Sequence, residues 1–241
     1  VFMRYIGSKR YLIENIAALI DEKLGESSEN LVLLDLFSGT TVVAQRLKPR
    51  YEVVTNDLMY FSYVIARGQV SLNTIPDFRK LEQMLGAEVL IYLNSLGGVD
   101  NAGFISTNYS LFGSERMYFT EDNAFKIDHI RATIESWRDK YLDDDAYYYL
   151  LACLIEAVPF VSNTSGIYGA YLKTWDKRAF LDLTLKHPII YDNMLDNKAY
   201  NSDANELVKR VVADICYIDP PYNSRQYTSN YHLLDTIAYG D

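Results

Sequence analysis

Short apolar runs recur along the chain with the length of buried β-strands. Residues 31–37 read Leu-Val-Leu-Leu-Asp-Leu-Phe, and similar runs occupy residues 51–55 and 214–218. Runs of this length that end at turn residues are typical of buried strands. The first run opens into Ser-Gly-Thr-Thr and then into a helical pattern over residues 42–47. A strand that passes through small residues into a helix predicts an α/β unit of the nucleotide-binding kind.

Helical spacing of apolar residues dominates the segments on either side of these runs. Apolar residues recur at this spacing over residues 12–20, and Ser8 is a suitable N-cap for the helix. Residues 58–96 also have a helical pattern, with a break near residues 73–76. We therefore expect the N-terminal part of the chain to alternate strands and helices.

A long middle block departs from this alternation. Residues 97–124 combine glycine, asparagine and serine with aromatic residues, which predicts a long loop that is functional or mobile. Residues 126–141 and 145–161 predict two helices. We interpret residues 74–180 as a largely helical insertion, after which the α/β pattern returns and a last helix begins near Asn230.

Composition narrows the class of protein. The chain has 241 residues, which is enough for a full core, and a net charge of −9. This charge argues against a protein that binds nucleic acid by bulk electrostatics, so any contact with DNA requires a local basic patch. Cys153 and Cys216 lie in apolar runs and are interpreted as reduced core thiols. With no membrane-spanning run and no signal-peptide pattern, we expect a soluble cytoplasmic protein.

The candidate chemistry lies directly after the run at 214–218. Pro220 and Pro221 fix the backbone and supply no N–H, so their carbonyls and the Asp219 carboxylate form a rigid group of hydrogen-bond acceptors. Tyr222 follows and adds an aromatic face. Such a corner suits a planar group that bears an NH2. The alternative interpretation is a strand end with ordinary turn residues.

A second group of residues predicts a cofactor site. Asp35 near the end of the first run is costly to bury without partners, although a capping role is the alternative. Asp57 follows the second run at the spacing from Gly39 at which an acid binds the hydroxyls of a ribose. Because no Gly-x-Gly-x-x-Gly motif is present, a cofactor with a ribose but no pyrophosphate fits better, and S-adenosylmethionine is such a molecule. Lys9 in a Gly-Ser-Lys turn is either a ligand of an anion or a solvated side chain.

Two further stretches carry polar residues of open role. Residues 162–173 form a glycine-punctuated loop, followed by Trp175, Lys177 and Arg178, and this mixture fits phosphates and base edges or an ordinary connection between helices. Asp203 lies at the start of a short helix, where capping is the alternative to a ligand role. The three histidines show no metal-ligand spacing, and no metal is predicted.

Several motifs together resemble those of adenine-specific DNA methyltransferases of the Dam-like group. They are Arg-Tyr-Ile-Gly-Ser-Lys at residues 4–9, Asp-Leu-Phe-Ser-Gly-Thr at 35–40, the loop that runs from Asn163 to Tyr171, and Asp-Pro-Pro-Tyr at 219–222. The stretch from residue 223 to 231 looks closest to methylases of the restriction-modification kind. The resemblance spans nearly the whole chain. Thr41 replaces the second glycine of the cofactor loop, and Tyr5 replaces the more usual tryptophan.

The resemblance implies a Rossmann-like S-adenosylmethionine-dependent α/β fold with a mostly helical target-recognition insertion. Residues 1–73 would bind the cofactor, 74–180 would form the insertion, and 181–241 would form the catalytic part. Because further strands normally follow the catalytic motif in such a sheet, we expect a truncated protein. Double-stranded DNA is the implied partner, and a cognate restriction endonuclease is left open. Neither a membrane nor a metal is implied.

The resemblance also assigns roles to single residues. Catalysis falls to Asp219, Pro220 and Tyr222. Cofactor contacts fall to Tyr5, Lys9, Asp35, Phe37, Gly39, Asp57, Asp203 and Asp219. DNA contacts fall to Asn163, Tyr168, Lys173 and Arg225.

The implied reaction is methyl transfer to the exocyclic amine of a flipped adenine. Asp219 and the Pro220 carbonyl would each accept one N–H of the amine, and Tyr222 would stack on the base. Two other functions stay open: methylation of a protein glutamine amide, and a DNA-reading subunit without catalysis. The intact Asp-Pro-Pro-Tyr motif and the helical insertion favour the DNA enzyme.

Overall fold

The computed structural model describes residues 9, 11–24, 31–97, 102–221 and 227–240. The chain divides into two compact units. An α/β unit comprises residues 5–75 and 189–224, and a helical unit comprises residues 76–188 and 225–241, with residues 1–4. The expected insertion at 74–180 therefore corresponds to residues 76–188 of the helical unit. The C-terminal segment from residue 225, which was assigned to the catalytic part, groups with the helical unit instead.

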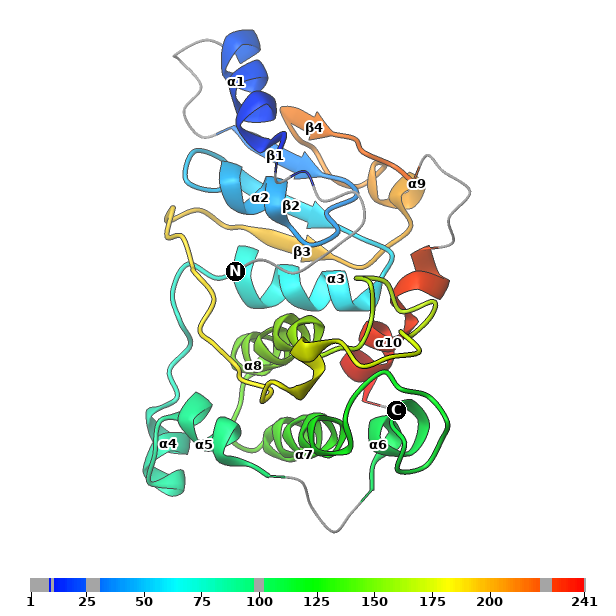
Figure 1. The fold of residues 1–241 in the computed structure, drawn as a ribbon. Helices are drawn as coiled ribbons and strands as arrows, with labels where there is room; N and C mark the ends of the chain where they lie inside the picture. Colours follow the sequence, from blue (N-terminus) through cyan, green and yellow to red (C-terminus); the bar gives the residue numbers. More distant parts are fainter. Residues whose placement is uncertain (1–8, 10, 25–30, 98–101, 222–226, 241) are drawn as a thin grey trace. The chain divides into compact units, whose positions relative to one another are not determined.

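The α/β unit is built on a parallel sheet with the strand order β3-β2-β1-β4 among the described residues (Figure 1). The strands are β1 (Val32–Asp35), β2 (Glu52–Asn56), β3 (Lys198–Tyr200) and β4 (Ile215–Tyr217). The three expected runs each contain a strand. The sequence did not predict β3, which pairs with β2 through only three residues. An all-parallel sheet agrees with the expected Rossmann-like class.

Helices cover both faces of this sheet. The helices of the unit are α1 (Ile13–Leu24), α2 (Val42–Leu47), α3 (Tyr60–Ile65), the π-helical turn η1 (Ala66–Val70) and α9 (Ala204–Leu207). Successive residues of a strand point to opposite faces. Leu33 accordingly packs in one cluster with residues of α1 and α2, while Leu34 packs with Leu207 of α9. The central strand β1 is thus buried on both sides, which explains its unbroken apolar run.

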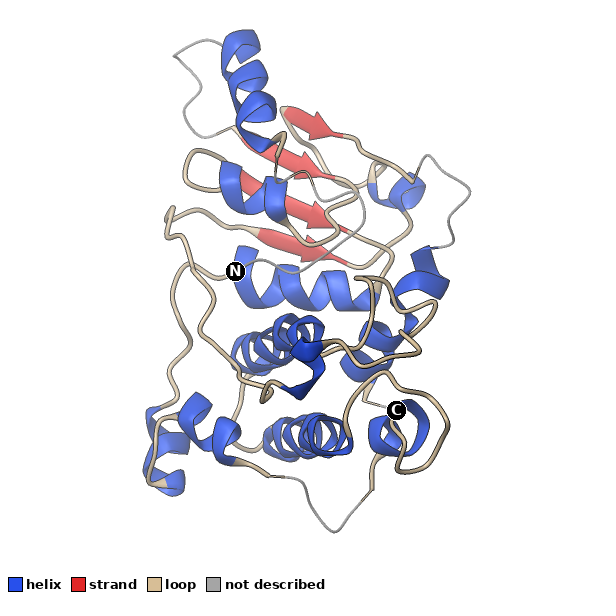
Figure 2. Ribbon diagram, in the orientation of Figure 1, coloured by secondary structure: helices blue, strands red, loops and turns tan. Residues whose placement is uncertain are grey.

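The helical unit is organised around a pair of long helices, α7 (Glu121–Trp137) and α8 (Asp144–Ala157) (Figure 2). Thr120 and Asp143 cap their first turns by accepting hydrogen bonds from backbone N–H groups. The other elements are α4 (Arg79–Leu85), α5 (Val89–Ser95), α6 (Phe104–Tyr109), the 3-10 turns η2 (Val158–Phe160) and η3 (Lys177–Phe180), and α10 (Tyr227–Tyr239). Helix α6 lies inside the stretch 97–124 that was expected to be loop.

The two cysteines, both of which were expected in the core, differ in burial. Cys153 is buried in α8, as expected, but Cys216 is exposed. The expectation for Cys216 was wrong because β4 lies at an end of the described sheet and is only partly covered. Within the described ranges, no helix has the length and apolar character needed to cross a bilayer.

Candidate active site

Three aspartates converge at one edge of the sheet. Asp35 ends β1 and is in register with Thr55 of β2 and Tyr217 of β4. Asp57 follows β2 directly, and Asp219 lies two residues beyond the end of β4. Because the strands are parallel, their carboxyl ends meet at the same edge. The chain runs from β1 outward to β2 on one side, while β4 joins β1 on the other, so this edge contains the switch point at which α/β sheets bind ligands.

The turn after β1 is fixed by hydrogen bonds to the end of β2. The Ser38 N–H donates to the Asn56 carbonyl at 2.8 Å. The Gly39 N–H donates to Oδ2 of Asp57 at 2.8 Å, and the Met59 N–H donates to Oδ1 at 2.9 Å. Gly39 has a φ of 51°, which favours glycine. Asp57 therefore holds the turn in place.

Asn56 is a structural neighbour of the candidate site to which the sequence analysis gave no role. Its Nδ2 donates to the Leu36 carbonyl at 3.2 Å and to the Ser202 carbonyl at 3.1 Å, and its Oδ1 accepts from the Ser202 N–H at 3.2 Å. It thereby ties the segment before α9 to the carboxyl edge of the sheet. An amide side chain next to the candidate ribose acid, at the end of a buried strand, was the signal that could have identified it.

Asp203 and Phe37 belong to the same side of the sheet. Phe37 packs on the cluster that also receives Ala204, the first residue of α9. Asp203 precedes it as an exposed N-cap and accepts a hydrogen bond from the Asn205 N–H at 2.8 Å. The capping role is thus present. A contact with a cofactor through the other carboxylate oxygen stays a prediction.

Thr41 adopts a backbone conformation that glycine normally occupies. Its φ is 61°, in the left-handed region, although the residue is β-branched and fully buried. Its Oγ1 accepts a hydrogen bond from Nε2 of Gln45 at 2.8 Å, and the same Nε2 donates to Oε1 of Gln69 at 2.6 Å. Thr41 is therefore bonded to Gln45, which is bonded in turn to Gln69 of the π-helical turn η1.

The electrostatics of the edge are dominated by negative charge. Burial, and after it the charges of Asp57 and Asp219, raises the pKa of Asp35 to about 7, and the backbone N–H groups of Ala44 and Phe37 offset this only in part. Asp35 is fully buried, and its Oδ1 has no hydrogen-bond partner in the described part of the chain. Ser38 Oγ is a second buried atom without such a partner. An edge of this kind attracts a cationic ligand.

Lys9 supplies a positive charge at this edge. Its Nζ lies 2.5 Å from Oδ2 of Asp219, and both side chains are largely shielded from solvent. The lysine therefore contacts the candidate catalytic carboxylate, a partner that the sequence did not predict. Pro220 is exposed. Tyr5, Tyr222 and Arg225 lie outside the described residues.

Three of the four predicted DNA contacts lie among the described residues, and their side chains differ in exposure. Lys173 is exposed. Asn163 is fully buried: its Nδ2 donates to the carbonyls of Met117 and Leu172, both at 2.9 Å, and its Oδ1 accepts from the Asp176 N–H. Tyr168 is also buried. The expectation of direct DNA contact is therefore corrected for these two residues, because their side chains are enclosed by protein and support the loop from inside.

The residues at the carboxyl edge fit S-adenosylmethionine as a bound group. This cofactor carries an ammonium and a sulfonium, and the unpartnered oxygens of Asp35 and Ser38 offer buried acceptors beside a carboxylate-rich edge. A contact of Asp57, at the end of β2, with the ribose stays a prediction. Among the described residues, no group of three or more His, Cys, Asp or Glu side chains could hold a metal ion.

Comparison with known proteins identifies a family and several relatives. Residues 5–241 match the family model described as D12 class N6 adenine-specific DNA methyltransferase. The chain is 49% identical over 242 residues to the type II methyltransferase M.FokI of Planomicrobium okeanokoites, covering 99% of this chain and 37% of the relative. It is 50% identical over 238 residues to the modification methylase StsI of Streptococcus sanguinis, covering 98% and 36%.

A more distant relative is matched over more of its own length. The type II methyltransferase M.NlaIII of Neisseria lactamica is 39% identical over 246 residues, which cover 99% of this chain and 70% of the relative. The chain thus spans little more than a third of the FokI and StsI proteins. No solved structure matches the sequence.

Proposed function

Because the chain belongs to the D12 class of N6 adenine-specific DNA methyltransferases, we propose that it transfers a methyl group from S-adenosylmethionine to the exocyclic amine of an adenine in double-stranded DNA. The observation that carries the proposal is the convergence of Asp35, Asp57 and Asp219 at the carboxyl edge of the sheet. A cofactor site and an acceptor corner for an amine then share one edge. The restriction-modification context of the relatives extends the proposal to a cognate endonuclease as partner.

The cofactor is held, in this proposal, by residues of the α/β unit. Asp35 and Ser38 receive the ammonium end, Asp57 binds the ribose hydroxyls, and Phe37 and Asp203 flank the adenine. When bound, S-adenosylmethionine supplies a methyl group on a positively charged sulfur. The carboxylates that raise the pKa of Asp35 favour this charge at the edge of the sheet.

The acceptor corner addresses the weak nucleophilicity of the adenine amine. The lone pair of this nitrogen is delocalised into the ring. Asp219 and the Pro220 carbonyl each accept one N–H, which favours a tetrahedral nitrogen whose lone pair is directed at the methyl group. Transfer would form the N–CH3 bond as the S–CH3 bond breaks and leaves its electron pair on sulfur, and Asp219 is placed to accept the proton that the nitrogen releases. The base reaches the corner only after it is flipped out of the duplex, at a cost of a few kcal/mol.

Lys9 has a positioning role at the corner. Its ammonium contacts Oδ2 of Asp219 at 2.5 Å, and a carboxylate has lone pairs left to accept the adenine N–H at the same time. The ion pair therefore fixes the orientation of the carboxylate before the substrate arrives. Such preorganisation reduces the entropy lost on reaching the reactive geometry.

The test is the transfer of a labelled methyl group to DNA by the parent and by Asp219→Ala. We expect the variant to lose transfer by at least about a hundredfold while it still binds the cofactor, because an acceptor aimed at the reacting nitrogen is removed. Asp196→Ala is the matched control, since Asp196 forms an exposed ion pair with Lys198 in the same unit. The label should appear as N6-methyladenine after digestion of the DNA.

The same assay separates the competing functions. Label in protein and none in DNA would point to an amide methylase, and DNA binding without any transfer would point to a reading subunit. Equal transfer by the parent and Asp219→Ala would exclude Asp219 from catalysis.

A further inference from the structure

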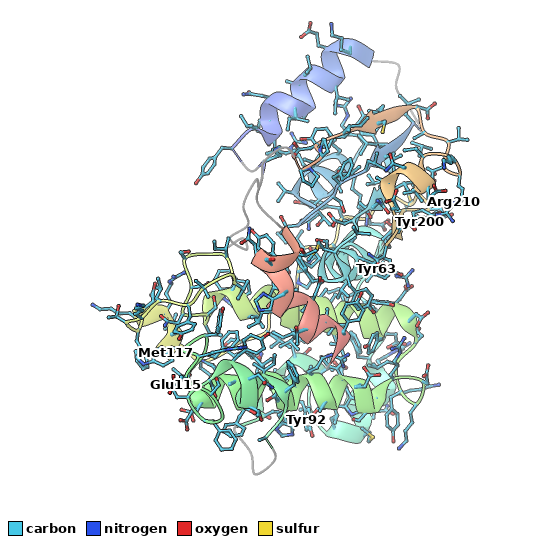
Figure 3. All side chains as sticks on the ribbon, turned by 90° about the vertical axis from the view of Figure 1, so that its right-hand side faces the viewer. Tyr63, Tyr92, Glu115, Met117, Tyr200 and Arg210 are labelled. Atoms are coloured by element: carbon cyan, nitrogen blue, oxygen red, sulfur yellow. The ribbon has the colours of Figure 1, made fainter. Side chains whose placement is uncertain are left out.

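Two loops of the helical unit, residues 110–118 and 163–178, are joined by hydrogen bonds and are called here the paired loops. The Asn163 N–H donates to the Tyr118 carbonyl at 2.8 Å, and the Asn163 side chain donates to the Met117 carbonyl at 2.9 Å. The Tyr118 hydroxyl donates to the Tyr168 carbonyl at 2.9 Å. Figure 3 shows Met117 and Glu115 on the side of the helical unit where the second loop runs. The paired loops therefore form one surface.

The first of these loops is firmly built, in contrast to the expected mobile stretch. Ser114 Oγ donates to the carbonyls of Asn108 and Ser110, at 3.2 and 3.0 Å. Gly113 lies so close to the Thr107 backbone that an added Cβ would come within 2.5 Å of its carbonyl oxygen. A loop that is fixed in this way presents its outer side chains in defined positions.

The outer side chains of the first loop are apolar or charged, and they include Leu111, Phe112, Glu115 and Arg116. Leu111 and Phe112 are about half exposed, at 48% and 50%, and the Phe112 ring is supported edge-on by Phe125. Arg116 is exposed, and its guanidinium lies over the ring of Tyr109, 5.7 Å from the centroid. Exposed apolar and cationic groups on one rigid loop indicate a contact surface.

The arginine is held by a chain of aromatic contacts that leads into the second loop. Tyr109, beneath the guanidinium, is buried and packs edge-on against Tyr118 at 5.3 Å. Tyr118 in turn packs edge-on against Tyr171 at 5.2 Å. An arginine stacked on a fixed ring loses little further freedom when it binds a planar partner.

The second loop adds positive charge in a chain that is acidic overall. Residues 163–178 contain three cations and one carboxylate, and the carboxylate, Asp176, is paired with Arg178 at 2.6 Å. Lys173 and Lys177 are exposed and form no ion pair with other described residues. A local excess of cations is what a chain with a net charge of −9 requires at a DNA contact.

We propose that the paired loops read double-stranded DNA, with Arg116 contacting the edge of a guanine base and Lys173 and Lys177 contacting backbone phosphates. The assignment rests on the proposed methylation of DNA and adds to it a specificity-determining residue. Arginine presents two parallel N–H donors that match O6 and N7 of guanine, whereas lysine on a flexible chain neutralises phosphate without reading sequence. Phe112 and Leu111 lie on the same loop, where they add apolar contact area.

The experiment compares Arg116→Ala, Lys173→Ala and Lys177→Ala in two assays. The first measures methyl transfer to a library of duplexes in which each base pair around the adenine is varied. Arg116→Ala should relax the preference at one G·C position by ten- to hundredfold and leave the other positions unchanged. Each lysine variant should lower transfer on all sequences alike.

The second assay measures the affinity for duplex DNA as a function of salt concentration. Each lysine variant should reduce the slope of log K against log salt by about one. Arg138→Ala is the control, because Arg138 also lies over a tyrosine ring, Tyr147, in the same unit but outside the paired loops. It should match the parent in both assays.

The outcomes distinguish this inference from the proposed function. An Arg116→Ala variant with the sequence preference of the parent, or lysine variants with an unchanged salt slope, would overturn the assignment even if the parent methylates DNA. A parent that transfers no methyl group, but binds DNA with slopes that the lysine variants reduce, would refute the proposed function and support the surface. Unfolding midpoints and cofactor binding equal to the parent exclude misfolding as the cause.

Discussion

Replacement of Asp35 by asparagine should stabilise the protein at neutral and alkaline pH while it removes cofactor binding. The pKa of this carboxyl is raised from about 4 to about 7 by burial beside Asp57 and Asp219. A shift of about three units corresponds to about 4 kcal/mol, the upper limit of what the folded state loses when Asp35 ionises. Asparagine has the same shape and carries no charge at any pH.

The sign of the effect follows from proton binding. Between pH 4 and pH 7 the folded state binds a proton at Asp35 that the unfolded state has released, so this group lowers the free energy of unfolding as the pH rises. Below pH 4 both states are protonated and the parent and the variant should differ little. Above pH 7 the variant should exceed the parent in free energy of unfolding by the full amount. This amount is smaller by about 1 kcal/mol because asparagine alters the hydrogen bonds from backbone N–H groups.

Urea unfolding of the parent and Asp35→Asn between pH 4 and pH 8 measures this difference. Across that range the free energy of unfolding of the variant should rise by about 2 to 4 kcal/mol relative to that of the parent. The same measurement on Asp196→Asn, at an exposed ion pair, should show almost no change. A difference that is constant with pH, or that falls as the pH rises, would refute the assigned environment of Asp35.

Calorimetry of cofactor binding tests whether the Asp35 carboxylate faces the bound cofactor. A cationic cofactor favours the ionised carboxylate, so binding to the parent near pH 7 should release a fraction of a proton and should strengthen from pH 6 to pH 8. Proton release is obtained by repeating the titration in buffers of different ionisation enthalpy. Binding without proton release by the parent would show that Asp35 does not face the cofactor.

The remaining predictions concern residues that hold the fold around the sites. In urea unfolding, Thr41→Gly should leave the free energy of unfolding nearly unchanged, whereas Thr41→Ala should lower it by about 1 to 2 kcal/mol. The reason is that alanine keeps the left-handed strain and lacks the hydroxyl bonded to Gln45. Equal stabilities of the two variants would argue against strain. Burial lowers the pKa of Lys48 to about 8, so the stability of the parent should rise between about pH 8 and pH 10.5 as the buried charge is lost. Lys48→Met should abolish this rise. A parent that shows no rise would contradict the burial of Lys48. The guanidinium of Arg131 binds the last carbonyls of α10, so Arg131→Met should lower the free energy of unfolding by about 2 to 4 kcal/mol and increase amide exchange at the end of that helix. Arg131→Lys should recover only part of this loss. Unchanged exchange would show that Arg131 does not hold the end of α10.

The sequence by itself determined the parts of the molecule that depend on near neighbours. The run at 31–37, its turn and the helix at 42–47 form a strand, a turn and a helix as expected, because apolar periodicity and turn chemistry act over a few residues. The same holds for the short helix that begins after Asp203 and for the helices α7 and α8. The motifs also identified the family, since the residue types of the cofactor and acceptor sites recur in fixed order.

Tertiary structure decided which of these residues meet and in what state. Strand β3 has only three residues, too few for a periodic signal, and exists because it pairs with β2. The burial of Asn163 and Tyr168 follows from packing between loops that are far apart in sequence.

The same reason applies at the carboxyl edge of the sheet. Asp35 and Asp219 are separated by most of the chain, and only the parallel register of β1 and β4 brings them together. The raised pKa of Asp35 and the contact of Lys9 with Asp219 depend on that register, because burial and charge act through space and not along the sequence.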